Sequence, residues 1–166
     1  MYKPQAALHH NFVEKIKLME RIVFSHYYPE QKLLVTRLSG LLNSSDINAW
    51  KDSLYKASEA MPDNSSFKIL VDLHGFKAEN FEVHKEYRTI MPLFLAEFGY
   101  RIGYLDMFPE ASVELKNNRG IRCVAMANVH QDESKMKDYQ EKFSKAFEQY
   151  FTDSRAGTQW INSYHI

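Results

Sequence analysis

The spacing of hydrophobic residues changes from a strand pattern to a helix pattern within the first third of the chain. Residues 22–28 and 32–38 are rich in aliphatic and aromatic side chains and flank a turn led by Pro29, which predicts a β-hairpin. Apolar residues then recur at intervals of three and four, at Ile47, Trp50, Leu54, Ala57 and Met61. This spacing predicts a helix, capped by a side chain among residues 43–46 and ended by Pro62.

A second strand and helix pair follows. Residues 67–72 form a short apolar run that stops at a Leu73-His74-Gly75 turn, which is typical of a buried central strand. Apolar positions at helical spacing over residues 83–94 predict a helix that covers this strand. Pro92 lies inside this helix and favours a kink or a restart near residue 91.

Two more strands and a long helix are predicted in the second half of the chain. Residues 100–107 and 121–129 have strand composition, and the polar residues 109–120 between them have the length of a loop or a short crossover helix. Apolar residues then recur in a polar background, at Met136, Tyr139, Phe143, Phe147 and Tyr150. This pattern predicts a helix that faces a core.

The chain closes with an expected edge strand over residues 150–152 and a helix capped by Asp153, with its inner side at Ala156, Trp160 and Ile161. The elements together predict an α/β fold, a mixed sheet of about four to six strands with an antiparallel start, a parallel remainder and helices packed on it. We expect one domain over residues 20–166, preceded by a tail or short helix over residues 1–19.

Composition restricts the class of protein. The 166 residues carry 21 Lys and Arg against 21 Asp and Glu and are 45% hydrophobic, which excludes a disordered chain and argues against nucleic acid as a partner. No apolar run approaches the roughly 20 residues that cross a bilayer, so no transmembrane segment is expected. The single Cys123, which we expect to be buried, cannot form an internal disulfide, and no signal-peptide pattern is present, which favours the cytoplasm.

Four segments of the chain stand in an order that resembles a known family. They are Gly40 after the second strand, Asp72-Leu73-x-Gly75 after the third, residues 121–127, and Tyr150-Phe151-Thr152-Asp153 followed by Ala156 and Trp160-Ile161. Over roughly residues 20–163 this order resembles the STAS domain, the fold of anti-sigma-factor antagonists, and is most similar to its SpoIIAA-like branch.

The resemblance implies a non-enzymatic regulatory or protein-interaction module of a bacterial type. In STAS domains a hydroxyl side chain near the start of the second helix accepts phosphate, whereas residues 77–83 here contain no hydroxyl and His74 replaces a serine. We therefore expect a module without the usual phospho-acceptor serine, whose partner is another protein or a second copy of the chain. The resemblance places the partner face at His74, Gly75, Phe76 and the start of the second helix, represented by Asn80. We expect Asp72, His130 and Asp132 to belong to the same ligand or partner face.

Polar side chains also gather at the predicted strand ends, where α/β sheets usually bind ligands. They are Asp72, His74, Asp106, His130 and Asp132. One hypothesis is a metal-dependent enzyme, because these groups would suit a divalent metal or an acid and base pair. The alternative is that Asp72 and Asp132 cap turns or helices. Since no metal-ligand spacing, phosphate loop or catalytic-serine motif is present, we expect no catalytic residue, metal or cofactor.

Aromatic residues support a third hypothesis, a small-molecule or lipid carrier. The chain contains 11 Phe and 10 Tyr, and the candidates for a pocket, a subunit contact or the core edge are Tyr27, Tyr28, Tyr55, Tyr100 and Tyr104. Near Pro92, an apolar groove over the sheet could be formed by Met91, Phe94 and Phe98. By analogy with CRAL-TRIO lipid-transfer domains, which the SpoIIAA-like branch resembles in fold, this groove would hold a lipid or another small apolar ligand.

Overall fold

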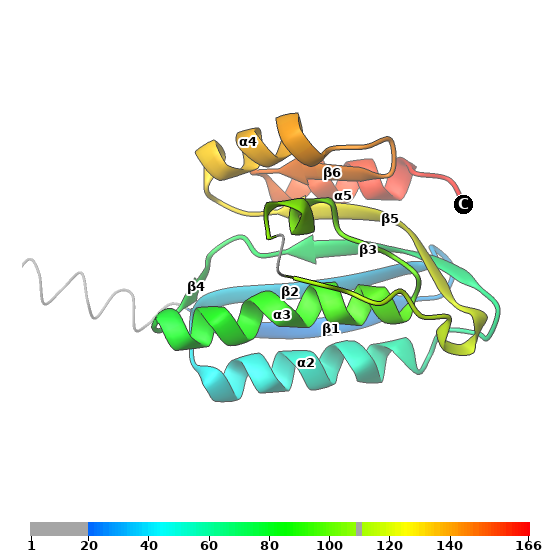
Figure 1. Ribbon diagram of the computed structural model, residues 1–166, viewed down its shortest axis with the longest axis horizontal. Coiled ribbons are helices and arrows are strands. Elements are labelled where there is room, and N and C mark those ends of the chain that lie inside the picture. The colour runs from blue at the N-terminus through cyan, green and yellow to red at the C-terminus, as the bar shows by residue number, and fades with distance from the viewer. Residues whose placement is uncertain (1–19, 109–110) are drawn as a thin grey trace, which may run out of the picture.

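A six-stranded mixed sheet forms the centre of the computed structural model, which describes residues 20–108 and 111–166 (Figure 1). The first two strands pair antiparallel and the other neighbours pair parallel, as the sequence predicts. The strand order is β1-β2-β3-β5-β6, and β4 pairs with the end of β2. The tail or short helix expected over residues 1–19 lies outside the described residues. The strands are β1 (Ile22–Tyr28), β2 (Leu33–Leu42), β3 (Ser66–Asp72), β4 (Phe76–Ala78), β5 (Arg122–Val129) and β6 (Glu148–Phe151).

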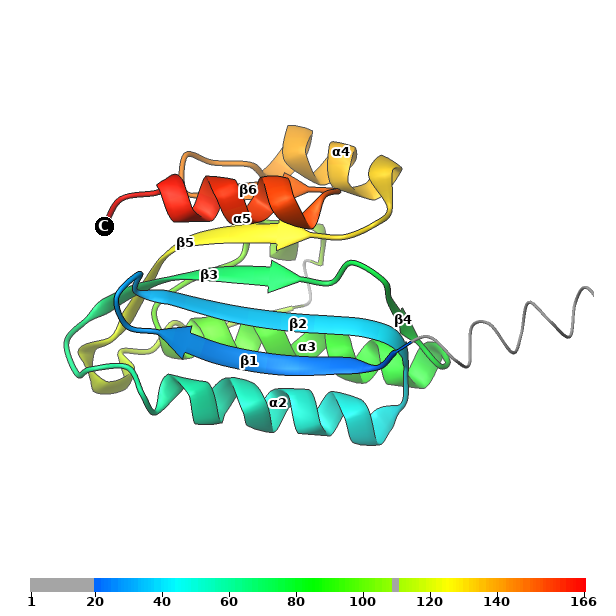
Figure 2. The same cartoon turned by 180° about the vertical axis from the view of Figure 1, so that it is seen from behind.

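Helices cover both faces of the sheet (Figures 1 and 2). The helices α2 (Ser44–Ser58) and α3 (Phe81–Glu97) lie on one face, and α5 (Ser154–Ser163) covers the other face over β3, β5 and β6. The helix α4 (Glu133–Phe143) packs beside β6 and the 3-10 helix η1 (Gly103–Met107), and a shorter 3-10 turn, η2 (Asn118–Gly120), precedes β5. Within the described residues, no helix is long and apolar enough to cross a membrane.

The predicted capping residues begin the helices. The Asn43 side chain accepts a hydrogen bond from the Asp46 backbone N–H, and the Asp46 carboxylate accepts one from the Asn43 backbone N–H, which makes a capping box for α2. Asp153 caps α5 by accepting from the backbone N–H of Arg155. These signals are local in sequence, so the starts of both helices agree with the sequence pattern.

Residues 100–107 do not form the predicted strand, and Gly103–Met107 form η1 instead. The cause lies far away in the sequence, in the fully buried side chain of Glu148. Its carboxylate accepts hydrogen bonds from the Gly103 backbone N–H at 3.0 Å and from the Tyr100 hydroxyl at 2.5 Å. Because the Gly103 donor is committed to this carboxylate, it is not free to pair with a strand.

The helix predicted through Tyr150 ends at Phe143. Ser144 has an extended backbone (φ −63°, ψ 145°), and Tyr150 belongs to β6, which pairs parallel with β5. The expected edge strand is therefore confirmed, and pairing with β5 overrides the helical spacing of Phe147 and Tyr150. By contrast, α3 runs through Pro92 without the expected restart.

The main core lies between the sheet and the two helices α2 and α3. Its largest fully buried side chains include Trp50, Phe67, Phe94 and Phe98. The Phe98 ring packs edge-on against Phe67 and Phe94, with centroid distances of 5.4 Å and 5.2 Å. Cys123 is a buried free thiol, as predicted, and burial raises its pKa.

Candidate ligand-binding cavity

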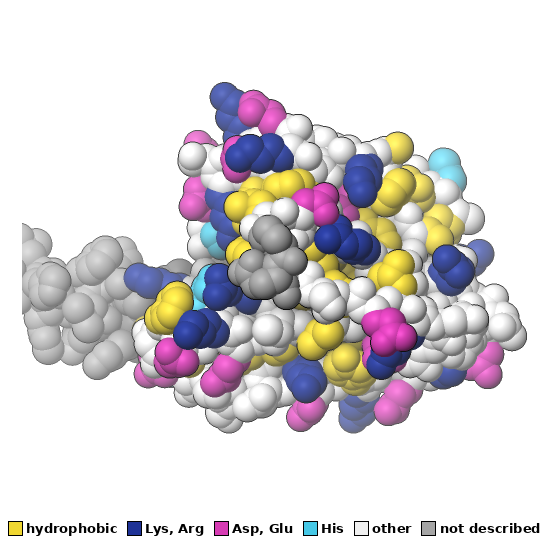
Figure 3. Space-filling model, viewed as in Figure 1, with side chains coloured by type: hydrophobic (Ala, Val, Ile, Leu, Met, Phe, Trp, Pro, Cys, Tyr) yellow, Lys and Arg dark blue, Asp and Glu magenta, His cyan; other side chains and the backbone are white. Residues whose placement is uncertain are grey.

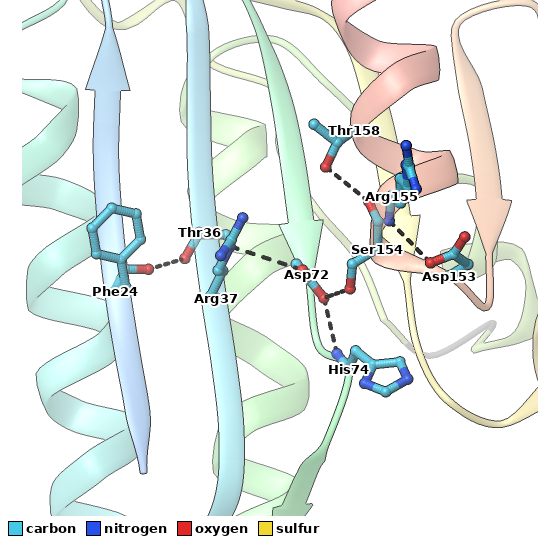
Figure 4. A network of polar contacts seen from close by, with 9 residues as sticks. All are labelled: Phe24, Thr36, Arg37, Asp72, His74, Asp153, Ser154, Arg155 and Thr158. Atoms are coloured by element: carbon cyan, nitrogen blue, oxygen red, sulfur yellow. Dashed lines mark hydrogen bonds and ion pairs between the residues drawn. The ribbon is translucent and has the colours of Figure 1, made fainter. Parts of the chain in front are cut away.

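Asp72, at the end of β3, joins three elements in a polar network (Figure 4). Its carboxylate accepts hydrogen bonds from the His74 backbone N–H and the Ser154 hydroxyl, both at 3.1 Å, and lies 3.8 Å from the Arg37 guanidinium. These contacts connect β2, the turn after β3, and the start of α5. The capping alternative is therefore correct for Asp72, because its side chain is used to hold the fold.

The expected partner face begins with a turn that is also held by hydrogen bonds. The Gln131 amide accepts from the Gly75 backbone N–H at 2.9 Å and donates to the Phe76 carbonyl at 3.1 Å. Gly75 has φ of 88°, and a Cβ there would lie 2.5 Å from the Ser39 hydroxyl oxygen, so only glycine fits. His74 is exposed, whereas Phe76 is buried against Tyr87.

The remaining candidates of the partner face and of the strand ends do not form one site. Asn80 and Asp132 are the N-caps of α3 and α4. The Nδ1 atom of His130 accepts a hydrogen bond from the Asp132 backbone N–H, so these two neighbours lie together. Asp106 is not at a strand end, because it lies in η1 and pairs with Arg101 at 2.5 Å. Among the described residues, no group of three or more His, Cys, Asp or Glu side chains is placed to hold a metal ion.

A cavity of about 590 Å³ lies between α3, α4, η1 and the carboxyl ends of β3 and β5, and we call it the α3–α4 cavity. Figure 3 shows hydrophobic and basic side chains intermixed on the face of the molecule where these elements meet. Most of the wall is apolar or aromatic. Its apolar and aromatic members are Val71, Leu73, Tyr87, Met91, Pro92, Leu93, Tyr104, Leu105, Phe108, Ala111, Val113, Val129, Met136, Tyr139 and Tyr150.

The charged and imidazole side chains of the wall, among the described residues, are basic. They are His84 and Arg88 from α3, His130 after β5, and Lys135 from α4, and no Asp or Glu of residues 20–108 and 111–166 lines the cavity. Burial, and next the positive charges of Arg88 and Lys135, lower the pKa of His84. Burial and Lys135 also lower the pKa of His130, against an opposing effect of the Asp132 carboxylate.

A smaller cavity of about 320 Å³ adjoins this basic group. His84, Tyr87, His130 and Lys135 line both cavities, so they form the boundary between them. Phe76 and Asn80 from the expected partner face line the smaller cavity. The expected partner face and the α3–α4 cavity are therefore adjacent.

Asn128, on β5, is a residue of the cavity wall whose side-chain amide nitrogen lacks a partner among the described residues. The side chain lines the α3–α4 cavity and is only 9% exposed. Its amide nitrogen is buried and has no hydrogen-bond partner among the described residues. Since a buried donor without an acceptor costs about 1–3 kcal/mol, an acceptor atom of a bound molecule would stabilise this position.

The apolar groove expected from the sequence is only partly correct. Met91 lines the α3–α4 cavity, but Phe94 and Phe98 do not, because α3 directs them into the main core. Of the five tyrosine candidates, Tyr104 lines the cavity, while Tyr100 is held by Glu148. The helical spacing of the sequence identified a buried side of α3 and did not separate its core positions from its cavity positions.

Sequence reasoning missed most of the basic wall. His84 and Arg88 are four residues apart and so lie on one face of α3, and Lys135 and Tyr139 have the same spacing on α4. This i, i+4 pairing of a basic residue with a basic or aromatic one was a signal in the sequence. It could not show that the two helix faces lie across the same cavity.

Comparison with known proteins adds no assignment. No family model matches the chain, and no match was found among curated proteins or among solved structures. The function must therefore be inferred from the cavity and its residues.

Proposed function

We propose that this chain is a STAS-like, non-enzymatic binding module that holds a small, largely apolar molecule in the α3–α4 cavity. The single observation that carries the proposal is the cavity of about 590 Å³ lined by mostly apolar walls. Small-molecule sites typically have about 300–1,000 Å³ and apolar walls with a few polar groups. The module would thus be a carrier or a ligand-sensing regulator.

Two further observations support the STAS-like part of the proposal and a cytoplasmic location, which we also propose. The elements follow the order that the resemblance implies, with a hairpin, then alternating helices and strands, and a closing helix that bears Trp160. The single cysteine, Cys123, is a buried thiol, which suits a reducing compartment.

Binding of N-phenyl-1-naphthylamine, a neutral dye whose fluorescence rises in apolar sites, tests the proposal. We expect saturable binding at one site per chain. Thr89 is exposed on α3 and lines the cavity, so Thr89→Trp should weaken binding at least about tenfold by filling part of it. Lys51→Trp, at an exposed position of α2 outside the cavity, is the matched control. Absence of saturable binding by the wild-type chain would overturn the proposal.

A second candidate function is protein interaction at the expected partner face, and the position of Phe81 favours it. Phe81 directly follows Asn80 at the start of α3, and it is 64% exposed, more than the other large hydrophobic side chains of the described residues. If this face pairs two copies of the chain, light scattering after gel filtration should give a dimer that Phe81→Ser converts to a monomer. Leu115→Ser, at another exposed hydrophobic residue, is the control. A monomeric wild-type chain would exclude the homodimer.

A further inference from the structure

The α3–α4 cavity has an uneven distribution of charge that specifies more than an apolar ligand. The whole chain has equal numbers of acidic and basic residues, 21 of each. Among the described residues, the cavity wall contains the cations Arg88 and Lys135 and no carboxylate. The described part of the adjoining cavity wall adds Lys77 and also contains no carboxylate. A net positive site inside a neutral protein favours an anionic ligand.

The two cations are held against aromatic rings. The Arg88 guanidinium lies 5.8 Å from the centre of the Phe108 ring, and the Lys135 ammonium lies 5.5 Å from that of Tyr139. In the part of the chain that the structure describes, neither forms an ion pair. A cation–π contact orients a cation but leaves its hydrogen-bond donors free, so both groups can donate to an anion.

His84 and His130 extend this cationic group toward the smaller cavity. The charged and titratable groups around them are Arg88 on α3, Lys135 on α4 and His74 after β3, with the Asp132 carboxylate as the acidic neighbour of His130, and His84 itself also acts on His130. Asp132 is exposed and accepts the capping hydrogen bond of α4, so it lies outside the cavity wall. A bound anion would therefore face the Arg88 guanidinium, the Lys135 side chain and two imidazoles.

We propose that the cavity binds an amphiphile whose anionic head group is held by His84, Arg88, His130 and Lys135 and whose apolar part lies against Tyr104 and Met136. The inference rests on the proposed function, because it requires that the cavity takes an apolar molecule. Asn128, whose buried amide nitrogen has no partner in the described ranges, supplies a further donor within the cavity. The ligand class is then a molecule such as a fatty acid, with one anionic end and one hydrocarbon end.

Three probes with the same alkyl chain and different head groups test this inference by displacement of bound N-phenyl-1-naphthylamine. We expect decanoate to bind at least about tenfold more tightly than decan-1-ol, because one charge-assisted hydrogen bond is enough to raise the affinity by that factor. Decyltrimethylammonium should bind most weakly. The double variant Arg88→Gln/Lys135→Gln should lose the preference for decanoate and keep its affinity for decan-1-ol. Lys51→Gln, a matched loss of charge outside the cavity, should change neither.

The outcomes separate the two proposals. If the dye binds and decan-1-ol displaces it as well as decanoate does, the anionic head group is refuted and the apolar cavity stands. If the dye does not bind, the proposed function fails, and this inference fails with it. Decanoate that binds tightly to the double variant would place the head group away from Arg88 and Lys135 and would also overturn the inference.

Discussion

Glu148 is a fully buried carboxylate whose hydrogen-bond partners are two tyrosines and a backbone amide. In the described residues it forms no ion pair. Tyr100 and Tyr150 each donate a hydroxyl hydrogen bond at 2.5 Å, and Gly103 donates its N–H at 3.0 Å. Burial, and then the nearby carboxylate, raise the pKa of both tyrosines, so the hydroxyls remain protonated donors. Glu148→Ala removes the common acceptor of three donors.

The size of the effect follows from this count of donors. Each buried donor left without an acceptor costs about 1–3 kcal/mol. Partial relaxation of the tyrosine hydroxyls lowers the sum, so we expect Glu148→Ala to reduce the free energy of unfolding by about 3–5 kcal/mol. For a chain of this length, 1 kcal/mol corresponds to about 2–4 °C in Tm, so the expected loss is on the order of 10 °C.

Urea unfolding followed by tryptophan fluorescence measures this difference, and single substitutions separate its parts. Tyr100→Phe and Tyr150→Phe each remove one hydrogen bond to a carboxylate and should cost about 1.5–3 kcal/mol. In a double-mutant cycle, Tyr100→Phe should cost much less in a Glu148→Gln background, because its charged acceptor is already lost. A change below about 0.5 kcal/mol for Glu148→Ala, as at a surface position, would refute the reasoning.

Three more predictions concern packing, capping and pH. A Cβ at Gly157 would lie 2.6 Å from Cγ2 of Val129, so Gly157→Ala should lower stability by about 1–3 kcal/mol, and an unchanged urea midpoint would contradict this close approach of α5 to β5. Asp132→Ala should lower the free energy of unfolding by about 1 kcal/mol because the α4 cap is lost, whereas Asp132→Asn should keep most of this stability in the same urea measurement. The lowered pKa values of His84 and His130 mean that the unfolded chain binds protons first as pH falls through 6.5. Stability of the ligand-free chain should therefore decrease below that pH, and a His84→Gln/His130→Gln variant should show a smaller decrease.

The parts of the fold that the sequence predicts are those decided by local patterns. The hairpin, α2 and β3 follow from hydrophobic spacing, and Asn43 and Asp153 supply caps that act within three residues. Errors arise where a distant residue decides the local structure. Residues 100–107 have strand composition, but Glu148 binds Gly103 and Tyr100 from across the domain.

The candidate site was less predictable than the fold, because the cavity is assembled from separate elements. For the residues at the strand ends, the alternative that they cap turns and helices is correct for Asp72 and Asp132, and Asn80 of the expected partner face caps a helix as well. The residues that define the cavity chemistry, Arg88 and Lys135, lie on different helices. Their relation depends on how the two helices pack, which hydrophobic spacing alone does not specify.

The Glu148 network and the α3–α4 cavity are physically linked through η1. Gly103, held by Glu148, begins η1, and the next two residues, Tyr104 and Leu105, line the cavity. Glu148 itself does not line it.

Glu148→Gln keeps the shape of the side chain but places an amide donor against the hydroxyl donors of Tyr100 and Tyr150 or the N–H donor of Gly103. As a result, η1 should be held less firmly. We therefore expect Glu148→Gln to weaken dye binding although it contacts no ligand, and Tyr100→Phe, which leaves the Gly103 bond intact, to weaken it less. Equal dye affinity in the wild type and Glu148→Gln, measured where both are folded, would show that η1 keeps the cavity wall in place without this carboxylate.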